Sequence, residues 1–365
     1  MAGTAPVSRE VELPAGCREL VRDVDEELDR ILREQRERMV GGDAGVSRPF
    51  EELERILGAG GKRLRPLFCL LGYRAAGARP GRQIVRAASA LELLHTFAIV
   101  HDDVMDRSPV RRGEPSSWIE FAEAHRREGM RGDPASYGVA SAVLVGDLAL
   151  ILADQSFLES GFPPARLLPA LERYNRMRAE MVAGQYLDVL AANTGAAGER
   201  EARRVAVLKS GLYTVEGPLH IGSLLAGTGP DLRGLLSRYG VSLGEAFQIR
   251  DDVLGVFGDP SATGKDHDSD LREGKRTVLL ARTLALVSAD EGRFIEECLG
   301  RPDLSAEDAE RIRSLMESSG ALASTLDLIE ELTEGAKSSL DDAPMAPDIA
   351  EMLREIGDVL ALRRA

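Results

Sequence analysis

The sequence predicts an all-α protein, one large bundle of long helices around an apolar interior. Apolar residues recur at the i, i+3, i+4 spacing of helices in many segments of the 365-residue chain. No sustained alternation of apolar and polar residues indicates strands, and no repeat or low-complexity tract divides the sequence. Several segments are apolar nearly all round, which is typical of helices at the centre of a bundle.

Helices are expected along most of the chain. The first covers residues 17–40, where Leu20, Val24 and Leu28 share one apolar face. The later predicted helices cover residues 84–105, 138–157, 167–190, 203–226, 236–257, 304–316 and, after Pro347, 349–360. Ser305 and Asp308 resemble a capping box at the start of one of them.

Polar, irregular segments are expected at residues 108–137 and 258–274, because both are rich in Gly, Pro, Ser and mixed charge. Both follow a cluster of aspartates. We divide the chain into an N-terminal helical extension, residues 1–48, and one helical domain, residues 49–365, on which the first helix packs.

The composition excludes several classes of protein. Acidic residues outnumber basic ones by 60 to 46, which argues against nucleic-acid binding and against an anionic membrane surface. The longest stretch without charged residues, 217–230, is too short for the roughly 20 apolar residues that span a bilayer. Cys17, Cys69 and Cys298 lie far apart, so no disulfide framework or cysteine zinc site is expected. With no signal peptide or prenyl anchor evident, we expect a cytoplasmic protein.

Lysine is rare in this chain: 41 of the 46 basic residues are Arg and only five are Lys. A lysine that is kept where arginine is the usual cation suggests a need for its compact ammonium group, and phosphate binding is one function that suits this group. Chance is the simpler explanation. The five positions are 62, 209, 265, 275 and 337.

The strongest local feature is the run His101-Asp102-Asp103-Val104-Met105-Asp106, at the end of a predicted apolar helix. Asp102 and Asp106 are four residues apart and stand about 6 Å from each other on one helix face. Two such carboxylates repel unless a cation lies between them, and oxygen ligands favour Mg²⁺ or Mn²⁺ over zinc. The alternative is a solvated acidic helix end.

A second aspartate pair, Asp251 and Asp252, also follows a largely apolar helix and precedes a polar loop. Two acidic helix ends that face each other across a bundle are able to hold several Mg²⁺ ions bridged by a diphosphate. Position 255, one turn later, is Gly, so a third carboxylate is missing here and a solvated helix end remains the alternative.

Basic residues accompany both clusters, as a diphosphate site requires. Lys62 lies in a Gly-Gly-Lys-Arg tract, and Arg111 and Arg112 follow the first aspartates. Lys265 and Lys275 flank the loop after the second aspartates, and Lys209 lies in an otherwise uncharged helix segment.

With these motifs the chain resembles the trans-isoprenyl diphosphate synthases, the polyprenyl synthetase family, over about residues 51–277. Five motifs occur in the family's order. They are GGKRLRP at 60–66, LLHTFAIVHDDVMD at 93–106 with SPVRRG at 108–113, GQYLD at 184–188, Lys209-Ser210, and FQIRDDVLGVFGD at 247–259 with TGKDHDSDLREGKRT at 263–277. The resemblance implies an isoprenoid-synthase bundle with a central apolar cavity, and a homodimer. It also implies an enzyme that joins isopentenyl diphosphate to an allylic diphosphate with about three Mg²⁺ ions, or Mn²⁺.

The resemblance also implies roles for individual residues, in three groups. The metal ligands would be Asp102, Asp106 and Asp251, with Asp252 nearby. The allylic diphosphate would be held by Arg111, Lys209 and Lys265, with Gln248 beside it. Isopentenyl diphosphate would be held by Lys62, Arg65, His95 and Arg112. His101 has no assigned role, and Ser210, Gly255 and Asp268 depart from the common pattern of the family.

Product length should depend on residues that precede Asp102 on its helix. Ala98 lies about 6 Å deeper than Asp102 and its small side chain lets a growing tail pass. Phe97 lies about 7.5 Å deeper and narrows the channel obliquely. This pattern favours the twenty-carbon geranylgeranyl diphosphate over the fifteen-carbon farnesyl product or longer chains.

Three other functions are considered. A terpene cyclase would share the first aspartate cluster but usually carries a different second metal motif. A phosphohydrolase with His-Asp ligands would need further metal-binding histidines. A regulatory subunit without activity would have no need to keep both acidic clusters and their cations.

Overall fold

The structure is a computed structural model that describes residues 13–41, 43–195, 198–258, 268–341 and 343–361. Helices make up almost all of this part. In chain order the elements are α1 (Ala15–Val40), α2 (Ala44–Gly58), α3 (Leu64–Ala75), α4 (Arg82–Met105), β1 (Val110–Arg111), β2 (Glu114–Pro115), α5 (Ser117–Arg127), α6 (Pro134–Leu158), α7 (Pro164–Thr194), α8 (Glu199–Ala206), the π-helix η1 (Val207–Glu216), α9 (Gly217–Ala226), α10 (Pro230–Phe257), α12 (Ser269–Glu273), α13 (Val278–Leu286), α14 (Ala289–Cys298), α15 (Ala306–Ser318), α16 (Ala321–Ser338) and α17 (Pro347–Ala361).

The predicted all-α class is confirmed, and the predicted helices are present with small shifts at their ends. Ser305 caps α15 by accepting a hydrogen bond from the backbone N–H of Asp308 at 3.0 Å. A reciprocal capping box is found instead at the start of α14, between Ser288 and Glu291.

Three segments differ from the prediction, and one of them is residues 258–274, which were expected to be irregular but contain the short helix α12. In addition, α2, α3, α13, α14 and α16 lie outside the predicted helix ranges. Residues 108–137, expected to be irregular, contain the small β1–β2 hairpin and α5, whose buried Phe121 and Ala122 form an apolar face within a charged run. Residues 203–226, expected as one α-helix, divide into α8, η1 and α9. The helix is continuous, but its middle ten residues have the wider π geometry. Periodicity does not distinguish these two helix types.

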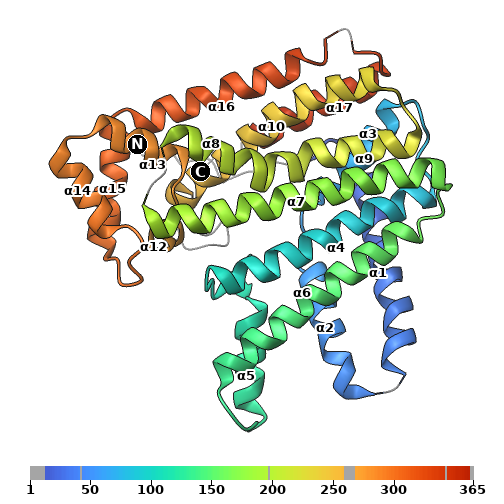
Figure 1. Cartoon of the computed structure of the whole chain (residues 1–365), viewed down its shortest axis with the longest axis horizontal. Helices are drawn as coiled ribbons and strands as arrows, with labels where there is room; N and C mark the ends of the chain where they lie inside the picture. The colour runs from blue at the N-terminus through green and yellow to red at the C-terminus, as the bar shows by residue number, and fades with distance from the viewer. Residues whose placement is uncertain (1–12, 42, 196–197, 259–267, 342, 362–365) are drawn as a thin grey trace, which may run out of the picture.

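The helices pack mainly side by side (Figure 1). α4 lies along α6, α3 lies along α9, and α10 lies against both η1 and α16. Helices α12 to α15 gather at one end of the molecule, at the left of Figure 1. The C-terminal parts of α4 and α10, which carry the two aspartate clusters, are therefore set within the bundle.

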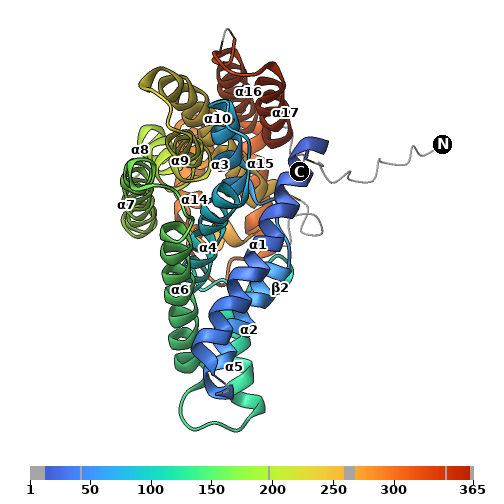
Figure 2. The same cartoon turned by 90° about the vertical axis from the view of Figure 1, so that its right-hand side faces the viewer.

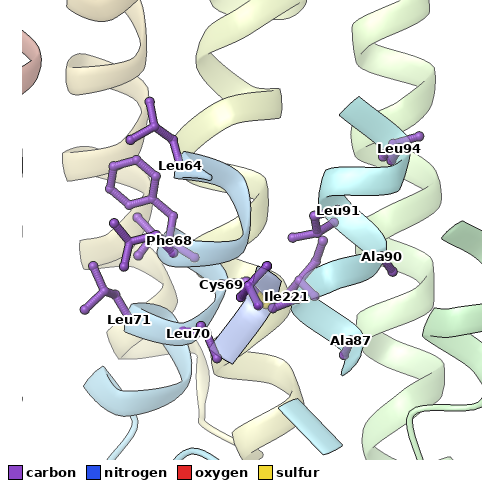
Figure 3. Close-up of a cluster of buried hydrophobic side chains, with 14 of the residues drawn as sticks. Leu64, Phe68, Cys69, Leu70, Leu71, Ala87, Ala90, Leu91, Leu94 and Ile221 are labelled. Atoms are coloured by element: carbon purple, nitrogen blue, oxygen red, sulfur yellow. The ribbon is translucent and has the colours of Figure 1, made fainter. Parts of the chain in front are cut away.

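The apolar interior forms two clusters. The larger one joins residues of α1, α3, α4, α7 and α9, and Figure 3 shows the part where Cys69 of α3, Leu91 of α4 and Ile221 of α9 lie next to one another. The smaller cluster joins the end of α10 to α13, α15 and α16, with Ile249 and Ile312 fully buried. Each fully buried aliphatic side chain stabilises the fold by about 1.5–3 kcal/mol relative to an exposed one.

Two helices are long and apolar enough to cross a membrane by length and composition. In α4, 72% of the apolar window is buried, whereas in α6 only 33% is buried. α4 is thus a core helix, and α6 keeps an apolar face outside the core of this chain.

Two glycines bring α3 and α9 into backbone contact. A Cβ atom on Gly72 would lie 2.1 Å from the carbonyl oxygen of Leu219, and one on Gly222 would lie 1.9 Å from that of Cys69. Neither backbone oxygen is able to move without moving its helix. The glycines therefore set the distance between the two helices.

Replacement of these glycines tests the packing. Gly222→Ala should destabilise the fold by about 3 kcal/mol or more, because the added methyl group forces the helices apart. Gly335→Ala in α16 is the matched control, since its Cβ would meet nothing within 4 Å. That variant should gain about 1 kcal/mol from helix propensity. Urea unfolding measures both, and equal stabilities would contradict the close approach.

Candidate active site

The candidate site lies where the ends of α4 and α10 meet α7, η1 and α12. Asp102 lies in the last turn of α4, and Asp106 follows directly as the C-cap residue. Asp251 and Asp252 lie in the last two turns of α10. The two aspartate clusters are thus presented by helix ends, as the sequence predicted.

Asp102 is surrounded by donors from three other elements. Its carboxylate accepts a hydrogen bond from the Gln185 amide of α7 at 3.0 Å. The Lys209 ammonium of η1 and the Arg111 guanidinium each lie 3.5 Å away. Lys209 also pairs with Asp188 of α7 at 2.7 Å. Burial lowers the pKa of Lys209, but Asp102 and Asp188 outweigh burial and the net shift is upward. The ammonium stays charged.

The position of Lys209 depends on a glycine in α7. A Cβ on Gly184 would lie 2.4 Å from the backbone nitrogen of Lys209. Because Gly184 has no side chain, η1 lies directly on α7 at this point, and the lysine reaches Asp188 and Asp102. This gives a physical reason for the glycine in the GQYLD motif.

Asp106 is linked to α12 through Lys275. The Lys275 ammonium lies 4.0 Å from Asp106, 2.9 Å from Asp270 and 2.7 Å from Glu273. Burial and the nearby charge of Asp102 raise the pKa of Asp106 to about 7. The site therefore contains more negative charge than its lysines neutralise, and an added cation would favour the ionised form of Asp106.

Asp252 of the second cluster is also buried close to other carboxylates. Asp252 accepts a hydrogen bond from Gln248 at 2.7 Å, one turn earlier on α10. Burial and the charge of Asp270 raise the pKa of Asp252 to about 8. Both clusters therefore favour cation binding on electrostatic grounds.

Asp270 occupies the space beside Gly255 where the sequence lacks a third carboxylate. A Cβ on Gly255 would lie 1.9 Å from a carboxylate oxygen of Asp270. Asp270 is buried, with only 7% of its surface exposed. A carboxylate from α12 thus lies where the helical motif would have supplied its own.

The two predicted phosphate-binding arginines lie in a small hairpin and contact different parts of the chain. β1 and β2 pair with Arg111 opposite Glu114, and the two loop residues Arg112 and Gly113 both have positive φ, 55° and 79°. That geometry is a type I′ turn. Arg111 is held by Asp103 with its Nε at 2.8 Å, next to the first aspartates. Arg112 instead donates to the backbone oxygen of Gly60, in the tract that contains Lys62.

Arg65 and His95 form a second polar cluster. Arg65 donates to Thr214 at 2.9 Å and stacks over the ring of Tyr213, at 4.4 Å from its centroid. Its Nε atom and the Nδ1 atom of His95 are buried without a hydrogen-bond partner among the described residues. Burial, together with Arg65 and Arg112, holds the pKa of His95 well below its usual range. Buried unpaired polar atoms among clustered cations point to an anionic ligand.

The remaining predicted residues are placed as follows. Lys62 is half-buried in the loop before α3, and Phe97 and Ala98 are half-buried on α4 beside the larger apolar cluster. Lys265 lies outside the described residues. Asp268, which the sequence suggested would add negative charge near the phosphates, pairs with Arg313 of α15 at 2.8 Å. Its charge is therefore largely neutralised.

Sequence reasoning left out several residues that the structure brings to the site. Gln185 and Asp188 lie in a motif that was noted but given no role, and Lys275 was noted only for its position. Asp270 and Glu273 lie within the 263–277 motif, but no role was expected for them because the turn that brings α12 back to α10 depends on tertiary packing. The surplus of acids after Lys265 was the one available indication.

Comparisons with known proteins agree with these features. A family profile described as polyprenyl synthetase matches residues 49–316. The chain is 31% identical to a geranylgeranyl diphosphate synthase of Sulfolobus acidocaldarius, over 89% of this chain and 93% of that enzyme. It is 34% identical to a geranylfarnesyl diphosphate synthase of Aeropyrum pernix, over 73% of this chain and 79% of that enzyme.

A solved structure is also similar. It is a geranylgeranyl pyrophosphate synthase from Corynebacterium glutamicum, complexed with isoprenyl diphosphate and magnesium. The TM-score is 0.91 at 34% identity, with 95% of this chain and 99% of that chain covered.

The contact between Gly255 and Asp270 gives a test of the second cluster. In Gly255→Ala the new methyl group displaces the Asp270 carboxylate from its place beside Asp252. We expect the thermal stabilisation by Mg²⁺ with pyrophosphate to shrink, and turnover to fall about tenfold or more.

Gly234→Ala on the same helix is the matched control, because its Cβ would meet nothing within 4 Å. If both variants keep the stabilisation of the unchanged protein, the relocated carboxylate has no part in the site.

Proposed function

The chain belongs to the polyprenyl synthetase family and is a trans-prenyltransferase, and we propose that its main product is geranylgeranyl diphosphate. Enzymes of this family use isopentenyl diphosphate and an allylic diphosphate. The observation that supports the use of two diphosphates is the presence of two separate cationic environments, one containing Arg111 and the other close to Arg112. One adjoins the aspartate clusters, and the other surrounds Arg65 and His95.

The first environment suits the allylic diphosphate. Lys209 and Arg111 lie at the first aspartate cluster, with Gln248 beside the second, and Lys265 is proposed to join them. When the allylic carbon–oxygen bond breaks, the diphosphate leaves with additional negative charge. Fixed cations at that point stabilise the developing charge without reorganisation.

The second environment suits isopentenyl diphosphate. Arg65, Arg112 and Lys62 would hold its diphosphate, and the unpaired Nδ1 of His95 is available as a further hydrogen-bonding group. A lowered pKa keeps His95 neutral near pH 7, so the positive charge around it comes from arginines, above all Arg65 and Arg112. The two substrates would then meet beside α4, where the double bond of one attacks the allylic carbon of the other.

Members of this family use a divalent metal, and the oxygen donors of this site fit Mg²⁺. Asp102, Asp106 and Asp251, with Asp252 and Asp270 nearby, supply only oxygen ligands, and Asp106 and Asp252 carry raised pKa values. Among the described residues, no three acids or histidines lie close enough to hold an ion by themselves. This agrees with the usual binding of Mg²⁺ by one or two carboxylates together with substrate phosphates. When bound, about three such ions would neutralise the leaving diphosphate.

The remaining steps need an apolar, dry environment more than a further catalytic side chain. The half-buried face of α4 at Phe97 and Ala98 would line the channel for the growing tail. The final proton is proposed to pass to the released diphosphate. The small side chain of Ala98 permits a longer tail than fifteen carbons, and the two relatives described above are named for geranylgeranyl and geranylfarnesyl products.

An assay with separated substrates tests the function. With Mg²⁺, isopentenyl diphosphate and geranyl diphosphate, the protein should yield geranylgeraniol after dephosphorylation and chromatography. Lys209→Gln should raise KM for the allylic substrate about tenfold, and Arg65→Gln should raise KM for isopentenyl diphosphate by a similar factor.

Lys337→Gln is the control, because Lys337 pairs with Glu334 and Asp358 on the surface. Equal effects of both site variants on both substrates would contradict the division. A dominant farnesol peak with isopentenyl diphosphate in excess would contradict the product length.

We also propose a homodimer that covers the outer faces of α6 and α7. Ten of the fifteen exposed large apolar side chains in the described part belong to these two helices, including Leu144, Ile151 and Tyr186, which are 60–65% exposed. Figure 2 shows both helices on the same flank of the molecule. A concentration of exposed apolar side chains on one flank is typical of a protein interface.

A charge placed on this flank tests the dimer. Ile151→Asp should convert a dimer into a monomer, because the interface would bury an unpaired carboxylate. Leu286→Asp on α13, where the native leucine is 56% exposed, is the control and should leave the dimer intact. Light scattering at micromolar protein distinguishes a mass of 39.4 kDa from twice that value. A monomeric unchanged protein would contradict the proposal.

A further inference from the structure

His101 precedes Asp102 in the sequence but faces away from the aspartate clusters. Its Nε2 lies 3.0 Å from the carbonyl oxygen of Val143 on α6, and 3.8 Å from the carboxylate of Asp147. A Cβ on Gly146 would lie 2.3 Å from both Nε2 and Cδ2 of the imidazole. The ring therefore fills the notch that this glycine leaves between α4 and α6.

The imidazole also contacts Phe97, which lies one turn earlier on α4. The two ring centroids are 4.7 Å apart, and the ring planes make an angle of 62°. This edge-to-face contact is a favourable arrangement for aromatic rings. Through His101, the Phe97 side chain is thus connected to the backbone of α6.

The last turns of α4 consequently carry two neighbouring stripes of side chains. Ala98 and Asp102 form one, and Asp102 contacts Gln185 of α7 and Lys209 of η1. Phe97 and His101 form the other, which faces α6. The residues are four apart within each stripe, and the two stripes lie about 100° apart around the helix axis. The Phe97 ring would therefore reduce the room beside Ala98 only if it were displaced from its place at His101 toward the Ala98 side of the helix.

We propose that His101, seated in the notch at Gly146, is a positioning residue that fixes the Phe97 ring and thereby determines product length. The inference rests on the proposed function, in which the face of α4 at Phe97 and Ala98 lines the elongation channel. His101 does not contact the substrate in this scheme. It acts by holding Phe97 toward α6 and keeping the side of Ala98 open.

Two variants should shift the product in opposite directions. In Gly146→Ala the methyl group takes the place of the imidazole, which is displaced toward Phe97 and pushes that ring over Ala98. The ratio of fifteen- to twenty-carbon product should rise about tenfold. In His101→Ala the space beside α6 becomes free for the Phe97 ring, the channel widens, and products of twenty-five carbons should increase.

The double variant separates this mechanism from a general effect on α6. In His101→Ala/Gly146→Ala no imidazole remains to be displaced, so the shortening caused by Gly146→Ala should disappear. Gly335→Ala in α16 is the matched control and should leave the product ratio unchanged, because its Cβ would meet nothing within 4 Å. The ratio is measured by chromatography of the dephosphorylated alcohols with isopentenyl diphosphate in excess, and it does not depend on the overall rate.

The outcomes that overturn the inference are distinct from failure of the function. If the unchanged protein elongates its substrate but Gly146→Ala gives the same ratio, or shortens the product equally with and without His101, the positioning role is wrong. If the unchanged protein makes no elongated alcohol, both the proposed function and this inference are overturned.

Discussion

Mutual repulsion among carboxylates is the constraint on which the rest of the site depends. Asp102 and Asp106 share one helix end, and Asp252 and Asp270 lie together across from them. Burial strengthens the repulsion, as the raised pKa values of Asp106 and Asp252 indicate. A protein that places so much negative charge in its interior has to supply cations from other elements. Here the cations are Lys209 of η1, Arg111 of the hairpin and Lys275 of the loop after α12.

Glycines make these charge contacts geometrically possible. Gly184 allows the backbone of η1 to lie on α7, and the Lys209 side chain is then close enough to pair with two aspartates. Gly146 serves a comparable purpose between α6 and α4, where the imidazole of His101 occupies the gap. In both cases the absence of a side chain on one helix determines the position of a polar side chain on the next. Close helix packing therefore determines where these polar side chains lie.

The helices and the two aspartate clusters were predictable from the sequence, because periodicity and i, i+4 spacing are local properties. The contribution of Asp270 was not predictable in this way, since it depends on how α12 returns to α10. The π geometry of η1 was likewise hidden, because the apolar pattern of residues 203–226 suits an α-helix equally well. The excess of helices that are apolar all round was one reason to expect a homodimer, but the sequence did not locate the exposed flank at Ile151, because a helix of this kind also suits the centre of a bundle. Such a helix is also found where a partner covers one face.

The departures from the family pattern illustrate why a motif is best assessed in space. Gly255 lacks the carboxylate that the second aspartate motif commonly provides, yet the same absence makes room for Asp270. Asp268 adds a charge to the loop, yet Arg313 of α15 pairs with it at 2.8 Å. Each departure taken alone suggests a weakened site. A neighbouring helix places a carboxylate beside Gly255 in the first case, and another places an arginine beside Asp268 in the second, so neither departure can be assessed from the letters of the motif alone.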